Sequence, residues 1–215
     1  MPQPLVVTIS ASYGAGGSVV APAVAERLGV TFADRVIPVA VAEAMSVPVD
    51  DALARDEQSP SLLQRILAAM ATSGMEEVGV APLPESRNPV HAHEAETRKA
   101  IRELAASGAV ILGRAGAFVL AKHPGALHVR LDGPEEARIA RATQTRNVDE
   151  ATARKRLESS DRARTAYVRH FHRADPGDPK HYHLVIRSTA FSADQCTDLI
   201  VAAAHARSAG SVPPT

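Results

Sequence analysis

The stretch LVVTISASYGAGGS, residues 5–18, decides the fold of this chain. Residues 5–9 are a continuous apolar run rich in β-branched side chains, which is typical of a strand buried on both faces of a parallel sheet. Glycines follow, and residues 18–28 then place apolar side chains at helical spacing, with Ser18 suited to cap the first turn and Gly29 to end it. The sequence therefore predicts a strand, a glycine-rich turn and a helix.

The same alternation continues along the chain. Strands are predicted over residues 30–33, 109–112, 127–131 and 182–186, and helices over 36–45, 115–122, 134–145 and 192–205. Strands that alternate with helices imply right-handed crossovers and an α/β fold, with a mostly parallel five-stranded sheet between two helical layers. We expect one domain over residues 1–206. The tail over 207–215 has too little apolar material to pack and is expected to be disordered.

Two regions interrupt this alternation. Residues 47–93 are predicted to form a helical insert, with an amphipathic helix at 62–71 that could be core or a dimer face, so a homodimer stays open. Residues 146–180 are expected to form a lid, because a long helical pattern dense in arginine runs through 148–173.

Composition narrows the classes of function. Twenty-four basic and twenty-four acidic side chains cancel, so no overall field favours nucleic acid or an anionic membrane, and small-molecule partners are expected instead. No apolar run reaches the roughly 20 residues of a membrane span, and the first run is too short for a signal peptide. With Cys196 as its single cysteine, expected to pack in the core, the chain is predicted to be cytoplasmic.

The glycine-rich turn is a candidate phosphate site, because a strand-to-helix turn aims backbone N–H groups and the helix dipole at one point. Against the phosphate-loop pattern G-x-x-x-x-G-K-[ST], Ala11 stands at the first glycine and Gly17 at the lysine. The alternative is a turn that binds no ligand. The candidate phosphate-binding residues are Gly14, Ala15, Gly16, Gly17 and Ser18.

Several short motifs resemble those of cytidylate kinase-like proteins. The segment S-x-x-Y-G-x-G-G over residues 10–17 follows the first predicted strand, and Asp34-Arg35 follows the second. Residues 110–114 resemble V-I-x-G-R, residues 161–167 resemble D-x-A-R-x-x-Y, and residues 182–184 resemble Y-D-L. The resemblance spans about residues 5–201, and its strength lies in the order of the five motifs.

The resemblance implies a P-loop NTPase-type fold and transfer of the γ-phosphoryl group of ATP to a pyrimidine nucleoside monophosphate such as CMP or dCMP. Magnesium would arrive with the nucleotide. Arginine suits the phosphate oxygens because its fork binds them bidentately and stays charged. The implied catalytic residues are Arg114, Arg138, Arg141 and Arg164, and the implied substrate-binding residues are Asp34, Arg35 and Asp161.

Four of these assignments have a structural alternative. Arg138 and Arg141 could be solvated side chains on one helix, and Arg164 could simply pair with Asp161 three residues earlier. Asp34 could be the cap of the helix predicted after it.

The chain also departs from the family pattern. Gly17 removes the lysine, residues 112–115 lack both carboxylates of the D-G-R-D segment, and His183 replaces the aspartate of Y-D-L. Ser18 is left as a candidate magnesium ligand. A second hypothesis is therefore a catalytically degenerate nucleotide-binding sensor or regulatory protein with little turnover. Restoring the lysine by Gly17→Lys is expected to recover part of the activity.

Three histidine pairs at 91 and 93, 170 and 172, and 181 and 183 invite a metal interpretation. Residues two apart on a helix point in different directions, so only His181 and His183 could share a strand face. Two ligands do not complete a zinc site. The histidine pairs therefore predict no metal site, and Ser18 stays the one candidate metal ligand.

Overall fold

The computed structural model describes residues 4–33, 89–113 and 115–209. The chain divides into two compact units, Met1–Arg35 with Ala100–Thr215, and Val36–Lys99. The predicted insert over 47–93 falls in the second unit, and the helices predicted over 36–45 and 62–71 lie outside the described residues. The single domain over 1–206 stays a prediction.

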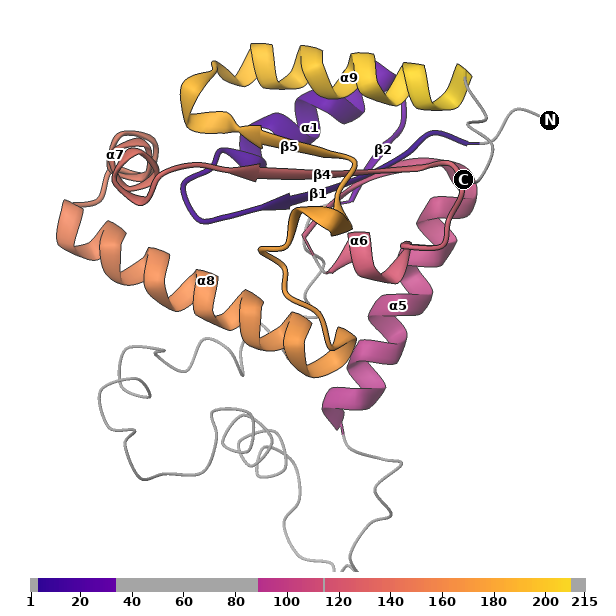
Figure 1. Cartoon of the computed structure of the whole chain (residues 1–215), viewed down its shortest axis with the longest axis horizontal. Helices are drawn as coiled ribbons and strands as arrows, with labels where there is room; N and C mark the ends of the chain where they lie inside the picture. Colours follow the sequence, from indigo (N-terminus) through magenta and orange to yellow (C-terminus); the bar gives the residue numbers. More distant parts are fainter. Residues whose placement is uncertain (1–3, 34–88, 114, 210–215) are drawn as a thin grey trace, which may run out of the picture. The chain divides into compact units, whose positions relative to one another are not determined.

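A five-stranded sheet forms the centre of the first unit (Figure 1). Its order is β2-β3-β1-β4-β5 and every pairing is parallel, which confirms the α/β fold predicted from the alternating pattern. β1 lies in the middle, where both of its neighbours hydrogen-bond to it, as its continuous apolar run requires. The strands are β1 (Val6–Ala11), β2 (Thr31–Ala33), β3 (Ala109–Leu112), β4 (Ala126–Asp132) and β5 (Leu184–Arg187).

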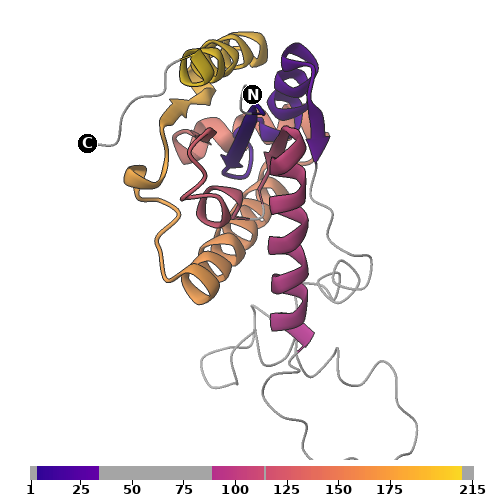
Figure 2. The same cartoon turned by 90° about the vertical axis from the view of Figure 1, so that its right-hand side faces the viewer.

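Helices cover both faces of this sheet. α1 (Gly17–Leu28) and α9 (Ala193–Ala209) lie side by side on one face (Figures 1 and 2). α6 (Gly116–Val119) and the C-terminal part of α5 (Pro89–Ser107) pack on the other face. No described helix is long and apolar enough to cross a membrane.

Beyond β4 the chain forms two further helices, α7 (Glu135–Arg146) and α8 (Glu150–His172). Asp149 caps α8, because its side chain accepts a hydrogen bond from the Thr152 N–H at 2.8 Å. Two short 3₁₀ turns, η2 (Pro179–His181) and η3 (Ser188–Ala190), flank β5.

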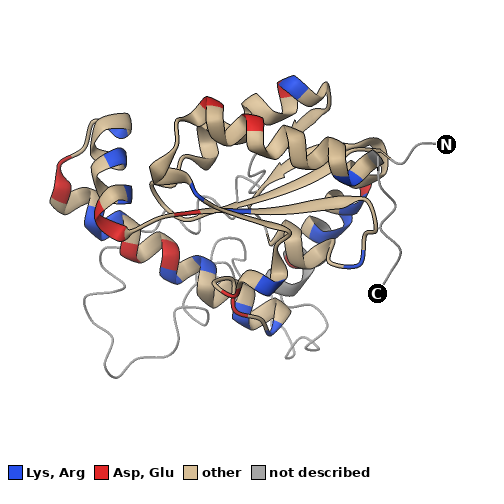
Figure 3. Ribbon diagram, turned by 45° about the horizontal axis from the view of Figure 1, so that its top comes forward, with Lys and Arg blue, Asp and Glu red and all other residues tan. Residues whose placement is uncertain are grey.

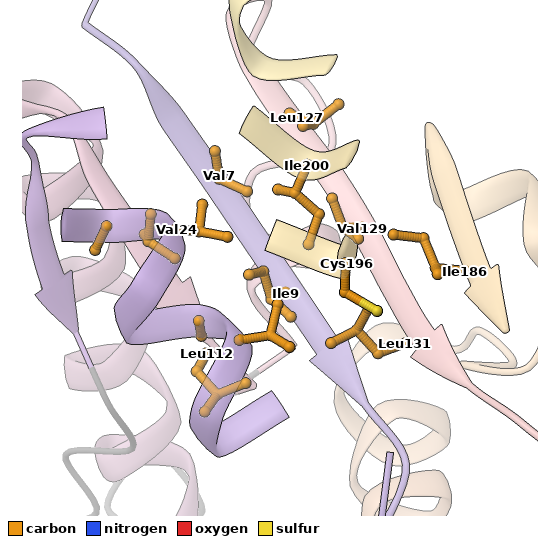
Figure 4. Close-up of a cluster of buried hydrophobic side chains, with 14 of the residues drawn as sticks. Val7, Ile9, Val24, Leu112, Leu127, Val129, Leu131, Ile186, Cys196 and Ile200 are labelled. Atoms are coloured by element: carbon orange, nitrogen blue, oxygen red, sulfur yellow. The ribbon is translucent and has the colours of Figure 1, made fainter. Parts of the chain in front are cut away.

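Alternation along β1 divides the buried side chains between two layers. Val7 and Ile9 point toward α1 and α9 and pack with Leu112, Val129 and Ile200 (Figure 4). Cys196 lies in this core at 1% exposure, as predicted, and burial raises the pKa of its thiol. A buried thiol with a raised pKa is packing material rather than a nucleophile.

The opposite face of the sheet carries buried polar side chains beside its apolar ones. The Thr8 hydroxyl lies 2.8 Å from His128 Nδ1, and both side chains are buried. The His183 ring stacks on His128, and its Nδ1 accepts from the His128 N–H at 2.9 Å. Burial first, and then the charges of His183 and Arg207, together lower the pKa of His128 to about 4.

Several predicted boundaries were wrong. α1 begins at Gly17, and Gly16, at φ 84°, is its N-cap without a side-chain hydrogen bond, so Ser18 is not the cap. α6 ends at Val119, although helix was predicted over 115–122. α9 continues through Ala209 because Arg207, expected in the disordered tail, donates from Nε to the Ala126 carbonyl at 2.8 Å.

The last strand was also placed too early. β5 begins at Leu184, so His181 and His183 do not share a strand face: His181 ends η2, and its ring packs at a tilt against Phe118. Among the described residues, no three His, Cys, Asp or Glu side chains gather as a metal-binding group.

Because the buried His128 is neutral, we expect the folded protein to lose stability as the pH is lowered. Between pH 6.5 and about 4 the unfolded chain binds a proton here that the folded chain does not, so folding is disfavoured as pH drops through this window. When the pH is lowered from 7 to 5, the free energy of unfolding of the wild type should decrease by about 2 kcal/mol more than that of His128→Gln. Urea unfolding at both pH values measures this difference.

The exposed His205 on α9 supplies the matched control. The variant His205→Gln should keep the pH dependence of the wild type. Equal slopes for wild type and His128→Gln would contradict a neutral buried His128.

Candidate phosphate site

The loop between β1 and α1 presents backbone N–H groups at a helix N-terminus. The Ser12 N–H donates to the Leu131 carbonyl at 3.1 Å, and the Ala15 N–H to the Ser12 carbonyl at 3.0 Å. The first hydrogen bonds of α1 run from Val19 and Val20 to the Gly16 carbonyl. The N–H groups of Gly17 and Ser18 precede these bonds and have no acceptor within the helix, so a helix N-terminus leaves them able to donate to a ligand, as the predicted phosphate site requires.

α7 packs directly against this loop. A Cβ built on Gly14 would lie 2.2 Å from the Arg138 carbonyl oxygen, and Gly14 has φ 75°. The Arg138 side chain folds back onto the same loop: Nη1 donates to the Tyr13 carbonyl at 3.0 Å and Nε to the Gly133 carbonyl at 2.9 Å. Only a glycine at position 14 permits this approach.

Asp161 of α8 ties the loop to both helices. Its Oδ1 accepts from the Tyr13 backbone N–H at 2.9 Å and from Arg164 Nη1 at 2.9 Å. Its Oδ2 accepts from Arg138 Nη1 at 2.6 Å. One carboxylate therefore fixes the backbone of Tyr13 and pairs with two guanidinium groups.

The Tyr13 side chain anchors the loop from the other side. It is 7% exposed and packs between α7 and α8 in a small apolar cluster with Ile139, Ala142, Ala153 and Leu157. The Arg146 guanidinium carbon lies 4.8 Å from the centre of the Tyr13 ring, within the range of a cation–π contact.

The end of β4 adds a second charged contact. Arg130 Nη2 donates to Asp132 Oδ2 at 2.6 Å and to the Ser12 hydroxyl at 3.2 Å. Burial alone would raise the pKa of Asp132, but the hydrogen bonds from Arg130 and the Gly133 N–H and the charge of Arg130 outweigh it and lower that pKa. Ser188, fully buried, donates to the Ala15 carbonyl at 2.7 Å.

Arg141 differs from Arg130, Arg138 and Arg164 because none of the described carboxylates neutralises it. Its Nη2 donates to the carbonyls of Ser188 at 2.8 Å and Phe191 at 3.2 Å. Its Nη1 lies 3.2 Å from the position that a Cβ on Gly16 would occupy. Within the part of the chain that the structure describes, Arg141 forms no ion pair.

Most of the predicted site residues come together here. The predicted phosphate-binding residues form the loop and the first turn of α1, and Arg138, Arg141, Asp161 and Arg164 surround the loop. Arg138 is 8% exposed, so it is not the solvated side chain of the alternative interpretation. Arg138 and Asp161 both form hydrogen bonds within the protein, so Asp161 is already engaged where a substrate would have to bind it. Three predicted residues lie outside the described ones: Asp34, Arg35 and Arg114.

Four residues of the site were not predicted: Tyr13, Arg130, Asp132 and Ser188. Asp132-Gly133 directly follows the predicted strand 127–131, and a polar residue at the carboxyl end of a parallel strand was a usable signal. No sequence pattern near Ser188 or Tyr13 indicates their contacts. Ser188, for example, donates to the carbonyl of Ala15, which is far away in the sequence.

One expected variant was wrong. A Cβ on Gly17 would lie 2.5 Å from the Cβ of Ala11 and 3.2 Å from Leu112 Cδ1. Because a lysine at position 17 would meet the Ala11 side chain on β1 at its first side-chain atom, Gly17→Lys alone cannot restore a phosphate-loop lysine.

The described residues do not supply a protein-held magnesium site. Asp132 is paired with Arg130, and Asp161 with Arg138 and Arg164, while position 115 is alanine. Magnesium prefers oxygen ligands with several waters, and nucleotide phosphates can provide them. Ser18, exposed in the first turn of α1, is the one predicted ligand on the described loop.

A parallel sheet of this order, with a glycine loop leading from β1 into α1, has the arrangement of a P-loop kinase-like fold. The sequence profile of the cytidylate kinase-like family matches residues 6–190. The chain therefore belongs to the cytidylate kinase-like family.

Individual proteins are similar to this chain over different shares of its length. A protein named uronate isomerase from Corynebacterium glutamicum is 32% identical over 101 residues, which are 47% of this chain and 20% of that protein. The structure of an uncharacterized protein from Eubacterium ventriosum is 20% identical, covers 95% of this chain and 99% of its own, and has a TM-score of 0.64, which shows the shared fold. Shikimate kinase from Acinetobacter baumannii is 13% identical, with 95% of each chain covered and a TM-score of 0.47.

The tight packing of α7 on the loop predicts that Gly14→Ala is strongly destabilising. Gly29, at φ 65° with no atom within 4 Å of an added Cβ, provides the matched control. Gly29→Ala should lose about 1 kcal/mol for its left-handed backbone, and Gly14→Ala at least about 1 kcal/mol more. Urea denaturation of both variants measures the difference, and equal losses would contradict the packing.

Proposed function

We propose that this protein is an ATP-dependent phosphotransferase that transfers the γ-phosphoryl group to a pyrimidine nucleoside monophosphate such as CMP or dCMP. The observation that carries the proposal is the loop itself: donors at Gly17 and Ser18 stand at the N-terminus of α1, beside an Arg141 that no described carboxylate neutralises. Membership of the cytidylate kinase-like family supports the same reaction.

Phosphoryl transfer asks the protein mainly for positioning and positive charge, because an acceptor oxygen attacks the γ-phosphorus as ADP leaves. The loop N–H groups would bind oxygens of the phosphate chain, and the Arg141 guanidinium would balance their charge. Arg138 and Asp161 would act indirectly by holding the loop in its donor geometry before the ligand arrives. Magnesium bound to the nucleotide would shield further phosphate charge.

The remaining predicted residues complete the proposal. Arg164, next to Asp161 on α8, would reach the transferring group when the helix moves as a lid. Asp34, Arg35 and Arg114 are proposed for the acceptor nucleotide, on the family motifs that contain them.

A second function is favoured by the same loop. Gly17 offers no lysine, and the described carboxylates at the loop are engaged by arginines. Losing one preorganised donor to the transition state costs about 10²–10³ in rate. A protein that binds nucleotide and turns it over slowly, or not at all, would serve as a sensor or regulator.

Calorimetry with ATP and an ADP-release assay with CMP, dCMP and UMP test both functions. We expect ATP binding, with turnover below about 1 s⁻¹, compared with roughly 1–100 s⁻¹ for typical kinases. Binding with slow turnover restricted to CMP and dCMP would support the phosphotransferase, and binding without turnover would support the sensor. Absence of ATP binding at millimolar concentration would contradict both.

A further inference from the structure

Position 17 is closed to any side chain by its neighbour on β1. The Cβ of Ala11 stands 2.5 Å from the place of a Cβ on Gly17, closer than two such carbons ever approach. The second contact, Leu112 Cδ1 at 3.2 Å, belongs to the end of a flexible side chain, which can shift. Ala11 is therefore the group that excludes a lysine.

The two departures from the phosphate-loop pattern are consequently one change. The pattern has glycine at position 11 and lysine at position 17, whereas this chain has Ala11 and Gly17. The methyl group of Ala11 fills the space that the first carbon of the lysine side chain would need. A loop with glycine at position 11 and lysine at position 17 can pack, and so can one with alanine at 11 and glycine at 17, but side chains at both positions would collide.

The loop nevertheless has a cation beside it. Arg141 reaches over Gly16 from α7, with two backbone carbonyls of the segment after β5 fixing Nη2 and with Nη1 directed to the loop. Three other nearby arginines are engaged by carboxylates: Arg130 by Asp132, and Arg138 and Arg164 by Asp161. Two described guanidinium groups at the loop form no ion pair: Arg146 lies over the Tyr13 ring, whereas Arg141 approaches Gly16 at the N-terminus of α1, where a phosphate would bind.

We propose that Arg141 takes the place of the phosphate-loop lysine as the cation for a bound polyphosphate, and that the Ala11–Gly17 packing fixes this exchange. The inference rests on the proposed function, because it assumes that the loop binds phosphate groups. It predicts that a lysine can enter only after Ala11 is reduced to glycine, and that this lysine can then replace Arg141.

The first test moves the positive charge from position 141 to position 17. Binding of inorganic triphosphate and of ATP is measured by calorimetry for wild type, Arg141→Met, and the triple variant Ala11→Gly/Gly17→Lys/Arg141→Met. Arg141→Met should weaken both ligands about 10- to 100-fold, as expected for a lost charge-assisted hydrogen bond. The triple variant should recover at least about tenfold of that loss, which a merely structural role of Arg141 would not allow.

Arg27 provides the control, because it pairs with Asp198 at the far end of α1 and carries the same charge. Arg27→Met should bind triphosphate as the wild type does. Equal affinities for Arg141→Met and Arg27→Met, or no recovery in a folded triple variant, would overturn the assignment to Arg141.

The second test is independent of any ligand. The loss of melting temperature caused by Gly17→Lys is measured in the wild type and in the Ala11→Gly variant. The loss should be several degrees larger when Ala11 is present, and equal losses would overturn the packing argument. If the wild type bound neither ATP nor triphosphate while this stability difference held, the proposed function would fail and the packing would stand.

Discussion

The carboxylate of Asp161 is the contact on which the geometry of the loop depends. It receives the Tyr13 backbone N–H and two arginines, so it joins the loop after β1 to α7 and α8 at a single point. Removing charges from water is costly, and such a group is stable only when its partners are in place. The position of the loop and the angle between the two helices are therefore determined together.

This arrangement gives most of the local charge a structural task. Charged residues of both signs gather along α7 and α8 (Figure 3). Arg154, for example, pairs with three glutamates: Glu135, Glu136 and Glu150. Arginine density in this region was the basis for predicting a lid. Many of these side chains are partners of carboxylates, and Arg141 stands apart because it contacts carbonyl oxygens instead.

The sequence predicted the features that depend on neighbouring residues. The apolar run before the glycines specified a buried strand, and the glycines specified a turn into α1, since both patterns act over a few residues. The cap was misplaced because the left-handed Gly16 starts the helix without a side-chain acceptor, so Ser18 was not needed there.

Contacts across the fold could not be predicted in the same way. Tyr13 and Asp161 are 148 residues apart, and the pairing of a backbone N–H with a carboxylate leaves no mark in either segment. Ala11 and Gly17 are close in sequence, but their mutual exclusion depends on how the loop returns to β1. In the sequence motif Ala11 and Gly17 are two separate departures, whereas in the folded loop they depend on each other, because one methyl group fills the space between them.

The most direct measurement is an NMR titration of ¹⁵N-labelled protein with inorganic triphosphate, following the backbone amides of the loop. The account predicts saturable shifts at Gly16, Gly17 and Ser18, because these N–H groups would donate to the anion. The amides of Gly29, at the other end of α1, and of Gly133, which donates to Asp132, should stay in place. Loop amides that do not shift at millimolar triphosphate, or shifts confined to other parts of the chain, would contradict the claim that this loop is a phosphate site.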